Sequence, residues 1–177
     1  MGTPISEEDF LARVRNFRES AFHLETRESY ALGYEREDLR RFLDGEPQDP
    51  ADIDWWRPWL ERVVAWREQG KHVSRVRVVD EPLTDYQRWM LWADPWHDAA
   101  GEDIRYIPRS VAVNIGLIRG YDWWLLDNRS VIIMRFTEAG EIDRKELIEE
   151  PGTVTRFQAW RDLAIRNASP AAQVAAA

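Results

Sequence analysis

The chain has 177 residues, a net charge of −8 at pH 7, and 44% hydrophobic and 12% aromatic residues, with ten tryptophans among them. This length and composition fit one domain with a real core, and the acidic balance excludes broad nucleic-acid binding, which needs a basic footprint. The absence of cysteine excludes disulfides, a thiolate nucleophile and a cysteine-based zinc site.

The N-terminal sequence MGTPISEEDF is acidic and has no apolar segment, so it lacks the pattern of a secretory signal peptide. No apolar run is long enough to cross a membrane. We therefore expect a soluble, cytoplasmic protein without membrane association.

Hydrophobic periodicity and turn signals predict the following elements in chain order: helix 7–20, strand 21–26, helix 35–44, helix 55–70, strand 72–79, helix 85–96, strand 103–108, helix 110–118, strands 122–126 and 131–136, and helix 153–167. Ser6 and Asp9 form a capping-box-like helix start, and Asp54 is expected to cap the helix over 55–70. The sequence DNRS over 127–130 is a hairpin signal between two apolar strands.

Helices alternate with strands along the chain, which predicts an α/β or α+β fold. We expect a single globular domain over residues 1–167, built on a small mixed β-sheet flanked by helices. The last ten residues, 168–177, are rich in alanine and are expected to form a disordered tail.

Four stretches resemble an actinobacterial family of uncharacterised domains: LETRESY near Leu24, RVRVVDEPLTDY, AGEDIRYIPR and DWWLLDNRSV. The resemblance covers nearly the whole chain. Because members are often encoded beside helix-turn-helix regulators, it implies a cytoplasmic accessory protein with a regulatory role, and it transfers no catalytic residues. The chain departs from the family pattern over 89–98, WMLWADPWHD, where it is richer in tryptophan.

The succession of strand, helix, strand, and then a strand that ends in aspartate before a hairpin also resembles half of a phospholipase-D-like domain. That superfamily carries a His-x-Lys-x4-Asp motif. With its aspartate aligned to Asp127, Gly120 takes the histidine position and Asp122 takes the lysine position. The resemblance therefore implies a degenerate binding domain that cannot perform histidine-based phosphoryl transfer.

Trp89, Trp92 and Trp96 are spaced three and four residues apart, which places them in one stripe on a helix. Such a stripe either packs in the core or forms an aromatic wall for a flat or cationic ligand.

His97 and Asp98 are the candidate catalytic residues, because a neighbouring carboxylate orients a histidine and raises its basicity for acid–base chemistry. The alternative is a solvent-facing histidine at a helix end. No second histidine cluster exists, so we predict no metal site. His23 is expected to be structural, with Glu25 on the same strand face.

Arg75 and Arg77 share one face of a predicted strand, and Arg105 and Arg109 share one face of the next. Four guanidinium groups on neighbouring strands would suit bidentate binding of a carboxylate or phosphate. The alternative is ion pairing with their acidic neighbours, which are Glu102, Asp103, Asp80 and Glu81.

Asp122 and Trp124 complete the candidate ligand site. Asp122 precedes two tryptophans and is expected at a pocket rim or in an ion pair with an arginine. Asp127 lies five positions further along, so the two carboxylates point to opposite faces and make a poor catalytic dyad. Asp127 is expected to bond the hairpin backbone.

These features support two hypotheses. The first is a non-catalytic binding or regulatory accessory protein with a Trp-lined pocket, which contacts a small molecule or a protein partner such as a helix-turn-helix regulator and can form a homodimer. The second is a small cofactor-independent enzyme of specialised metabolism that acts on an aromatic or cationic substrate, with acid–base residues near His97. Neither hypothesis requires a cofactor.

Overall fold

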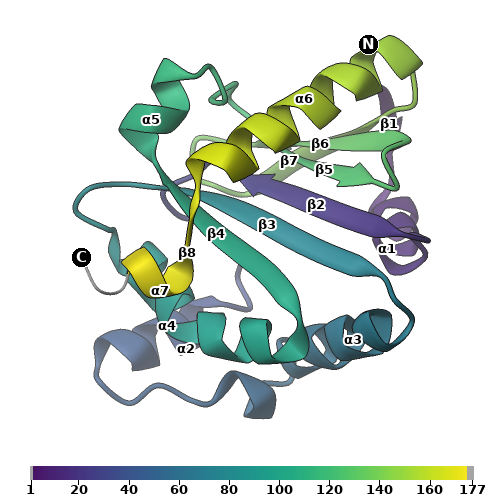
Figure 1. The fold of residues 1–177 in the computed structure, drawn as a ribbon. Coiled ribbons are helices and arrows are strands. Elements are labelled where there is room, and N and C mark those ends of the chain that lie inside the picture. The colour runs from purple at the N-terminus through teal and green to yellow at the C-terminus, as the bar shows by residue number, and fades with distance from the viewer. Residues whose placement is uncertain (1, 175–177) are drawn as a thin grey trace.

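The computed structural model describes residues 2–174, which form one eight-stranded mixed sheet with helices on both faces (Figure 1). The strands lie in the order β1-β7-β6-β5-β2-β3-β4-β8. Their bounds are β1 Thr3–Ile5, β2 Ser20–Glu25, β3 His72–Val79, β4 Glu102–Pro108, β5 Asp122–Leu126, β6 Ser130–Phe136, β7 Ile142–Ile148 and β8 Ser169–Pro170. The pairs β2–β3 and β3–β4 are parallel, and the other pairs are antiparallel.

The helices are α1 Glu7–Arg15, α2 Arg36–Leu43, α3 Arg57–Glu68, α4 Asp85–Ala100, α5 Arg109–Asn114, α6 Pro151–Asn167 and α7 Ala171–Val174, with a 3-10 turn at Pro50–Asp52. Helices α5 and α6 cover one face of the sheet, whereas α1, α3 and α4 cover the other (Figure 1). The predicted single α/β domain with a mixed sheet between helices is therefore confirmed.

The central strands are buried on both faces, and their alternation separates two kinds of surface. On β2, Phe22 and Leu24 pack into the apolar cluster beneath α6, whereas His23 and Glu25 point to the opposite face. The same alternation on β3 places Arg75 and Arg77 on that opposite face, and on β5 it places Asp122 and Trp124 there. The sheet thus presents a row of polar side chains beneath α1, α3 and α4.

Helix α4 has strong signals at both ends. Thr84 and Gln87 form a capping box at its start. Gly101 ends it with a φ of 108°, a left-handed backbone conformation that favours glycine. The predicted end near residue 96 was too early: the helix continues past Pro95 because Ala93, His97 and Ala100 are buried in the core.

Three other local predictions need correction. Helix α1 ends at Arg15, not near residue 20. Asp54 does not cap α3, whose N-cap is Trp56 without a side-chain bond, and instead pairs with Arg57 over 3.1 Å. Strands β1 and β7 were not predicted, because β1 has three residues and β7, IDRKELI, is charged and largely exposed.

The β5–β6 hairpin is confirmed. Asp127 and Asn128 have φ values of 54° and 55°, the left-handed pair that a tight hairpin turn requires. The Asp127 carboxylate accepts backbone N–H bonds from residues 18–20, which ties the hairpin to the start of β2 and holds the pKa of this carboxyl below its usual range even though burial works against it.

At the C-terminus, α6 ends at Asn167, the predicted domain boundary, and β8 and α7 follow it. The division into a domain and a disordered tail stays a prediction, and residues 175–177 of that tail lie outside the described residues. Within residues 2–174, no helix has the length and apolar character needed to cross a membrane.

Candidate functional site

A pocket of about 430 Å³ lies on the polar face of the sheet, between strands β2, β3 and β5 and helices α1, α3 and α4. The irregular segment before α2 closes one side and contributes Tyr30, Leu32, Tyr34 and Glu35 to the lining. The volume falls in the range of small-molecule binding sites.

Aromatic side chains form the walls of this pocket. Trp55 stacks on Trp56 with 4.7 Å between ring centroids, and Tyr34 lies 5.0 Å from Trp55. Trp59 meets Trp124 edge to face at 6.2 Å. The four tryptophans and the tyrosine offer a large, rigid apolar surface of the kind that binds flat or cationic groups.

The floor carries a network of buried charges. Glu25 accepts hydrogen bonds from Arg75 and Arg77, the latter from Nε over 2.7 Å. Burial alone would raise the pKa of Glu25, but the two guanidinium groups outweigh it and hold this pKa at about 2. Glu25 is therefore a carboxylate throughout the physiological pH range.

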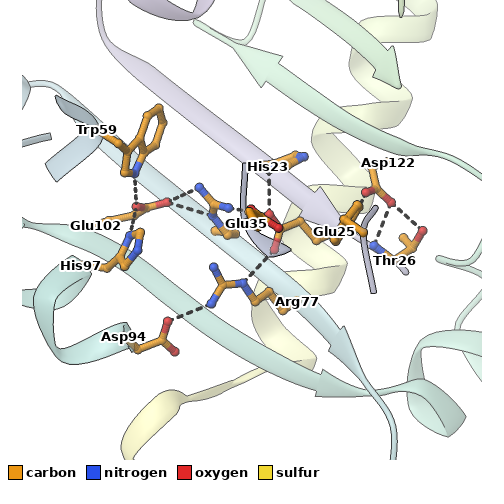
Figure 2. A network of polar contacts seen from close by, with 12 residues as sticks. His23, Glu25, Thr26, Glu35, Trp59, Arg77, Asp94, His97, Glu102 and Asp122 are labelled. Carbon is orange, nitrogen blue, oxygen red and sulfur yellow. Dashed lines mark hydrogen bonds and ion pairs between the residues drawn. The ribbon is translucent and has the colours of Figure 1, made fainter. Parts of the chain in front are cut away.

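Glu102 is the second centre of this network, and its side chain is fully buried. It accepts from Nε of Arg75 over 2.9 Å and from the indole N–H of Trp59 over 2.9 Å, and Nδ1 of His97 lies 2.7 Å away (Figure 2). Although burial works in the opposite direction, Arg75 and the hydrogen bonds hold the pKa of Glu102 below its usual range.

His97 has a defined tautomer in this arrangement. The indole N–H of Trp56 can only donate, and it lies 2.8 Å from Nε2 of His97, so Nε2 is the acceptor. Nδ1 therefore carries the proton and donates it to Glu102. Both ring nitrogens are engaged within the chain, and neither is free to act as a base on a ligand.

Arg77 is neutralised from two sides. Besides its bond to Glu25, it donates to Oδ1 of Asp94 over 2.8 Å (Figure 2). Tyr106 donates to the other oxygen of Asp94. Burial raises the pKa of Asp94, against the opposing effect of Arg77. Arg75 and Arg77 are thus each paired with two carboxylates, which leaves little positive charge for an anionic ligand.

Asp122 is completely buried at the edge of the pocket. One carboxyl oxygen accepts from the backbone N–H and hydroxyl of Thr26 over 2.8 and 2.7 Å, and the other accepts from the hydroxyl of Tyr30. Burial raises the pKa of Asp122 to about 6, although these bonds work in the opposite direction. The carboxyl is committed to holding the segment after β2.

His23 and Trp124 differ from these neighbours because their side-chain nitrogens make no hydrogen bond within residues 2–174, although Nδ1 of His23 lies 3.4 Å from Oε1 of Glu25. The two rings stack with centroids 4.2 Å apart, and among the described residues neither nitrogen of His23 nor the indole nitrogen of Trp124 makes a hydrogen bond. Burial lowers the pKa of His23 to about 3, so the ring is neutral at physiological pH. Unpaired buried polar atoms are rare in native proteins and often mark functional positions.

Glu35 is the other exception. It is only 8% exposed, and its single side-chain hydrogen bond comes from the hydroxyl of Tyr86 over 3.0 Å. Burial raises the pKa of Glu35 to about 7, although the bond from Tyr86 works in the opposite direction. An acid of this kind changes charge close to physiological pH.

The structure brings together only part of the predicted site. The side chains of five predicted residues line the pocket, namely Arg75, Arg77, His97, Asp122 and Trp124. The others lie elsewhere among the described residues: Trp89, Trp92, Trp96, Asp98, Arg105 and Arg109. His97 is buried, at 3% exposure, so the solvent-facing alternative is wrong.

The tryptophan stripe of α4 divides between two environments. Trp89 is 1% exposed and packs edge to face against Trp56 and Tyr86 in the core. Trp92 and Trp96 are half-buried, with 5.1 Å between their ring centroids, and Trp92 contacts Phe42 of α2. The pocket is therefore Trp-lined, but by residues of α3, of β5 and of the turn before α3.

The four predicted arginines do not form one site. Arg105 pairs with Asp103 over 3.1 Å and Arg109 with Asp80 over 2.5 Å, so the ion-pair alternative holds for both. Arg109 starts α5 and does not extend the strand. Asp98 is exposed and lines a separate cavity of about 330 Å³ beside α7. No group of three metal-ligating side chains occurs within residues 2–174.

Sequence reasoning missed Glu35, Trp55, Trp59 and Tyr30. Tyr30 lies in irregular backbone and Glu35 is the N-cap of α2, at the very start of the predicted helix, so periodicity does not predict which way either side chain points. The strands did carry a signal for the polar face of the pocket. On two strands that are buried on both faces, polar residues alternate with apolar ones: His23 and Glu25 on β2, and Arg75 and Arg77 on β3. Polar residues at such positions mark a site or an internal ion-pair network.

The fold that carries the pocket is similar to the folds of two solved structures. A phospholipase D family member, Nuc from Salmonella typhimurium, matches with a TM-score of 0.53 and 16% identity over 93% of this chain and 90% of that chain. NucT from Helicobacter pylori matches with a TM-score of 0.52 and 8% identity over 92% and 89%. At these identities the likeness shows the fold alone, which confirms the resemblance to a phospholipase-D-like domain.

In sequence, a family model described as a domain of unknown function, DUF6879, matches residues 8–176. No curated protein matches the chain.

Proposed function

Because the chain belongs to the DUF6879 family, a domain of unknown function, we propose a function from its pocket: it is a non-catalytic binding protein that holds a small organic molecule. The proposal rests on one observation: the charged groups on the pocket floor are paired within the chain, whereas the aromatic groups on its walls are open to a ligand. Arg75 and Arg77 on the floor are already paired with carboxylates of the chain, whereas the aromatic walls remain available to a ligand.

The residues at the motif positions support binding over phosphoryl transfer. In the alignment on Asp127, the chain has Gly120 where the superfamily has histidine and Asp122 where it has lysine. Asp122 is completely buried and accepts hydrogen bonds from Thr26 and Tyr30, so it structures the pocket edge. This chain lacks the nucleophile and the cation of that chemistry at those positions.

We also propose that the protein acts in the cytoplasm with a protein partner, of which a helix-turn-helix regulator is the candidate that the sequence resemblance suggests. Ligand occupancy would then change the surface beside the pocket. Tyr34 at the pocket and Leu43 at the end of α2 are exposed apolar side chains on this side of the molecule, which suits a contact surface. As an alternative to a different protein partner, we propose that the chain forms a homodimer.

A specific observation favours a second candidate, a small cofactor-independent enzyme. Glu35 has a pKa of about 7 and faces the pocket, which suits a general acid–base residue. In this version Glu35 replaces His97 as the proton carrier, because both nitrogens of His97 are engaged by Trp56 and Glu102.

A fragment screen against a matched pair of variants tests the proposal. Ile142 lines the pocket and is 37% exposed, so Ile142→Trp places a large side chain at the pocket without creating a core clash. Val113 on α5 is 55% exposed and does not line the pocket, so Val113→Trp is the control.

Ligand-observed NMR should find fragments that bind the wild type and Val113→Trp equally and bind Ile142→Trp at least several-fold more weakly. Fragments that bind all three proteins alike would contradict the proposed pocket. Conversion of a bound fragment over time, lost in Glu35→Gln, would favour the enzyme over the binding protein.

A further inference from the structure

Glu35 stands apart from the other acids of the pocket because it has no ion-pair partner within the part of the chain that the structure describes. Glu25 and Glu102 have arginine partners, and Asp122 accepts hydrogen bonds at both oxygens. For Glu35, only the Tyr86 hydroxyl donates, to Oε2, and within residues 2–174 no arginine, lysine or histidine lies in ion-pairing distance. The other oxygen, Oε1, has no hydrogen-bond donor among the described residues and stays accessible at the pocket.

Burying a carboxylate without an ion pair is costly, because burial removes much of its hydration. For Glu35, the Tyr86 bond and the charges of Arg77 and Arg75 offset only part of this cost, since the net effect still raises its pKa. Proteins keep such groups where a ligand supplies the missing charge or where the group carries a proton. Glu35 lines the pocket together with the aromatic walls, so a ligand in the pocket could reach it.

The aromatic surroundings favour a cation over other ligands. Tyr34 is next to Glu35 in the chain and lies 5.0 Å from Trp55, which stacks on Trp56. Aromatic faces attract ammonium groups through their quadrupole, and an adjacent carboxylate adds charge pairing and a hydrogen-bond acceptor. Carboxylate and aromatic rings together form a recognition site for an amine.

Anionic ligands fit the same pocket less well. The two buried guanidinium groups are each held between two carboxylates, and freeing one would break a buried ion pair. Arg15 and Arg62 also line the pocket, but Arg15 is exposed and Arg62 is only half-buried, so water and salt screen their charge.

We propose that the pocket binds an organic amine in its ammonium form, with Glu35 as the charge partner and Tyr34, Trp55 and Trp56 as the aromatic contacts. This inference rests on the proposed function and names its ligand class. Binding is then linked to ionisation, because only the deprotonated carboxyl pairs with the ammonium group.

Three matched probes test the inference by isothermal titration calorimetry: 2-phenylethylamine, 2-phenylethanol and phenylacetate, which share a ring and differ in charge. At pH 8 the amine should bind the wild type at least tenfold more tightly than the alcohol, with phenylacetate the weakest. Glu35→Gln keeps the size and the acceptor for Tyr86, and should weaken amine binding about tenfold or more while leaving the alcohol unchanged.

The control is Glu46→Gln, which removes an exposed carboxylate just beyond α2 and should change none of the three affinities. In the wild type, amine affinity should increase as pH rises from 6 and level off above pH 8, and Glu35→Gln should abolish this dependence. A pH dependence that persists in Glu35→Gln would point to another acid, such as Asp122, whose pKa burial also raises, and would overturn the role of Glu35.

The inference is overturned if the amine and the alcohol bind within twofold of each other, if phenylacetate binds best, if Glu35→Gln leaves the amine preference intact, or if none of the probes binds. The proposed function is judged separately. Neutral or anionic fragments that are sensitive to Ile142→Trp would preserve the binding pocket while excluding the amine, whereas the absence of any such fragment would remove both.

Discussion

The indole N–H of Trp56 donates to Nε2 of His97 across 2.8 Å, and this contact joins α3 to the far end of α4. Since Nδ1 faces Glu102 at 2.7 Å, the histidine is locked between a donor and an acceptor. A residue that the sequence presents as a candidate base is therefore part of the frame that supports the pocket.

We predict that His97 is present as the Nδ1–H tautomer, with Nε2 unprotonated. Nitrogen-15 NMR of the histidine side chains distinguishes the two nitrogens directly. Trp56→Phe should remove the donor to Nε2, change the His97 ring signals, and destabilise the protein by about 2–4 kcal/mol, because the buried Nε2 loses its donor and the smaller ring leaves a cavity. A protonated Nε2 in the wild type at pH 7 would contradict this arrangement.

Glu35→Gln is predicted to stabilise the protein at pH 8. The folded-state pKa of about 7 lies above the unfolded value, so the wild type loses stability as pH rises between about 4.5 and 7, and the neutral amide avoids that loss. The charges that act on Glu35 are those of Glu25 on β2 and of Arg75 and Arg77 on β3, and the hydroxyl of Tyr86 on α4 donates to it.

From the size of this shift, the stabilisation at pH 8 is about 3 kcal/mol and disappears below pH 4. Urea unfolding of both proteins at the two pH values measures it, and Glu46→Gln should show no such pH-dependent difference. A variant that is less stable than the wild type at pH 8 would mean that Glu35 already has a cationic partner.

Glu25→Gln is predicted to have the opposite effect. The folded-state pKa of about 2 lies below the unfolded value, so the stability that Glu25 contributes is present above about pH 4.5 and is lost as pH falls toward 2. Its removal also leaves Arg75 and Arg77 with one carboxylate each, and breaking such a buried pair costs roughly 3–5 kcal/mol at pH 7.

The unfolding free energy of Glu25→Gln relative to the wild type, measured from pH 7 to pH 3, tests this prediction. The difference should shrink with falling pH. Glu68→Gln, at the exposed end of α3, serves as the control and should stay within about 0.5 kcal/mol of the wild type. Equal stability of Glu25→Gln and the wild type at pH 7 would show that the charge network is not coupled as described.

Two tryptophans should separate stability from binding. Trp89 is almost completely buried, so Trp89→Ala should cost about 4 kcal/mol. Trp55 is half-buried at the pocket and its indole donates to Asp38 over 2.8 Å, so Trp55→Phe should cost only about 1 kcal/mol while weakening ligand binding several-fold. Chemical unfolding and calorimetry measure the two effects, and the reverse ranking of stability would refute the assignment of core and pocket.

The sequence allows the fold to be predicted where alternation and turn chemistry are strong. Strand β3 is found at its true bounds, and the hairpin after β5 follows from the Asp127-Asn128 pair. Strand β7 is not predicted from the sequence, because charged residues outnumber apolar ones on its exposed face. Its position is set by pairing with β6. Long-range pairing of this kind leaves no local signature.

The site is less predictable than the fold for the same reason. Arg75, Arg77 and Asp122 draw attention as charges within apolar strands, but the sequence does not show that Glu25 and Asp94 neutralise the arginines. Glu35 starts a predicted helix, but its burial depends on the tertiary packing of this helix start against Tyr86, which the sequence does not show. The spacing of Trp89, Trp92 and Trp96 is compatible with a ligand wall, but α2 and α3 cover α4. The three rings therefore lie away from the pocket.

The most direct test of the account is the indole N–H spectrum of the tryptophans during titration with 2-phenylethylamine. Trp55, Trp56, Trp59 and Trp124 line the pocket, whereas Trp123 and Trp160 pack on the opposite face of the sheet. We predict that the signals of the pocket tryptophans shift in a saturable manner while those of Trp123 and Trp160 stay in place. Shifts centred on Trp160, or an unchanged spectrum at saturating amine, would contradict a ligand site in this pocket.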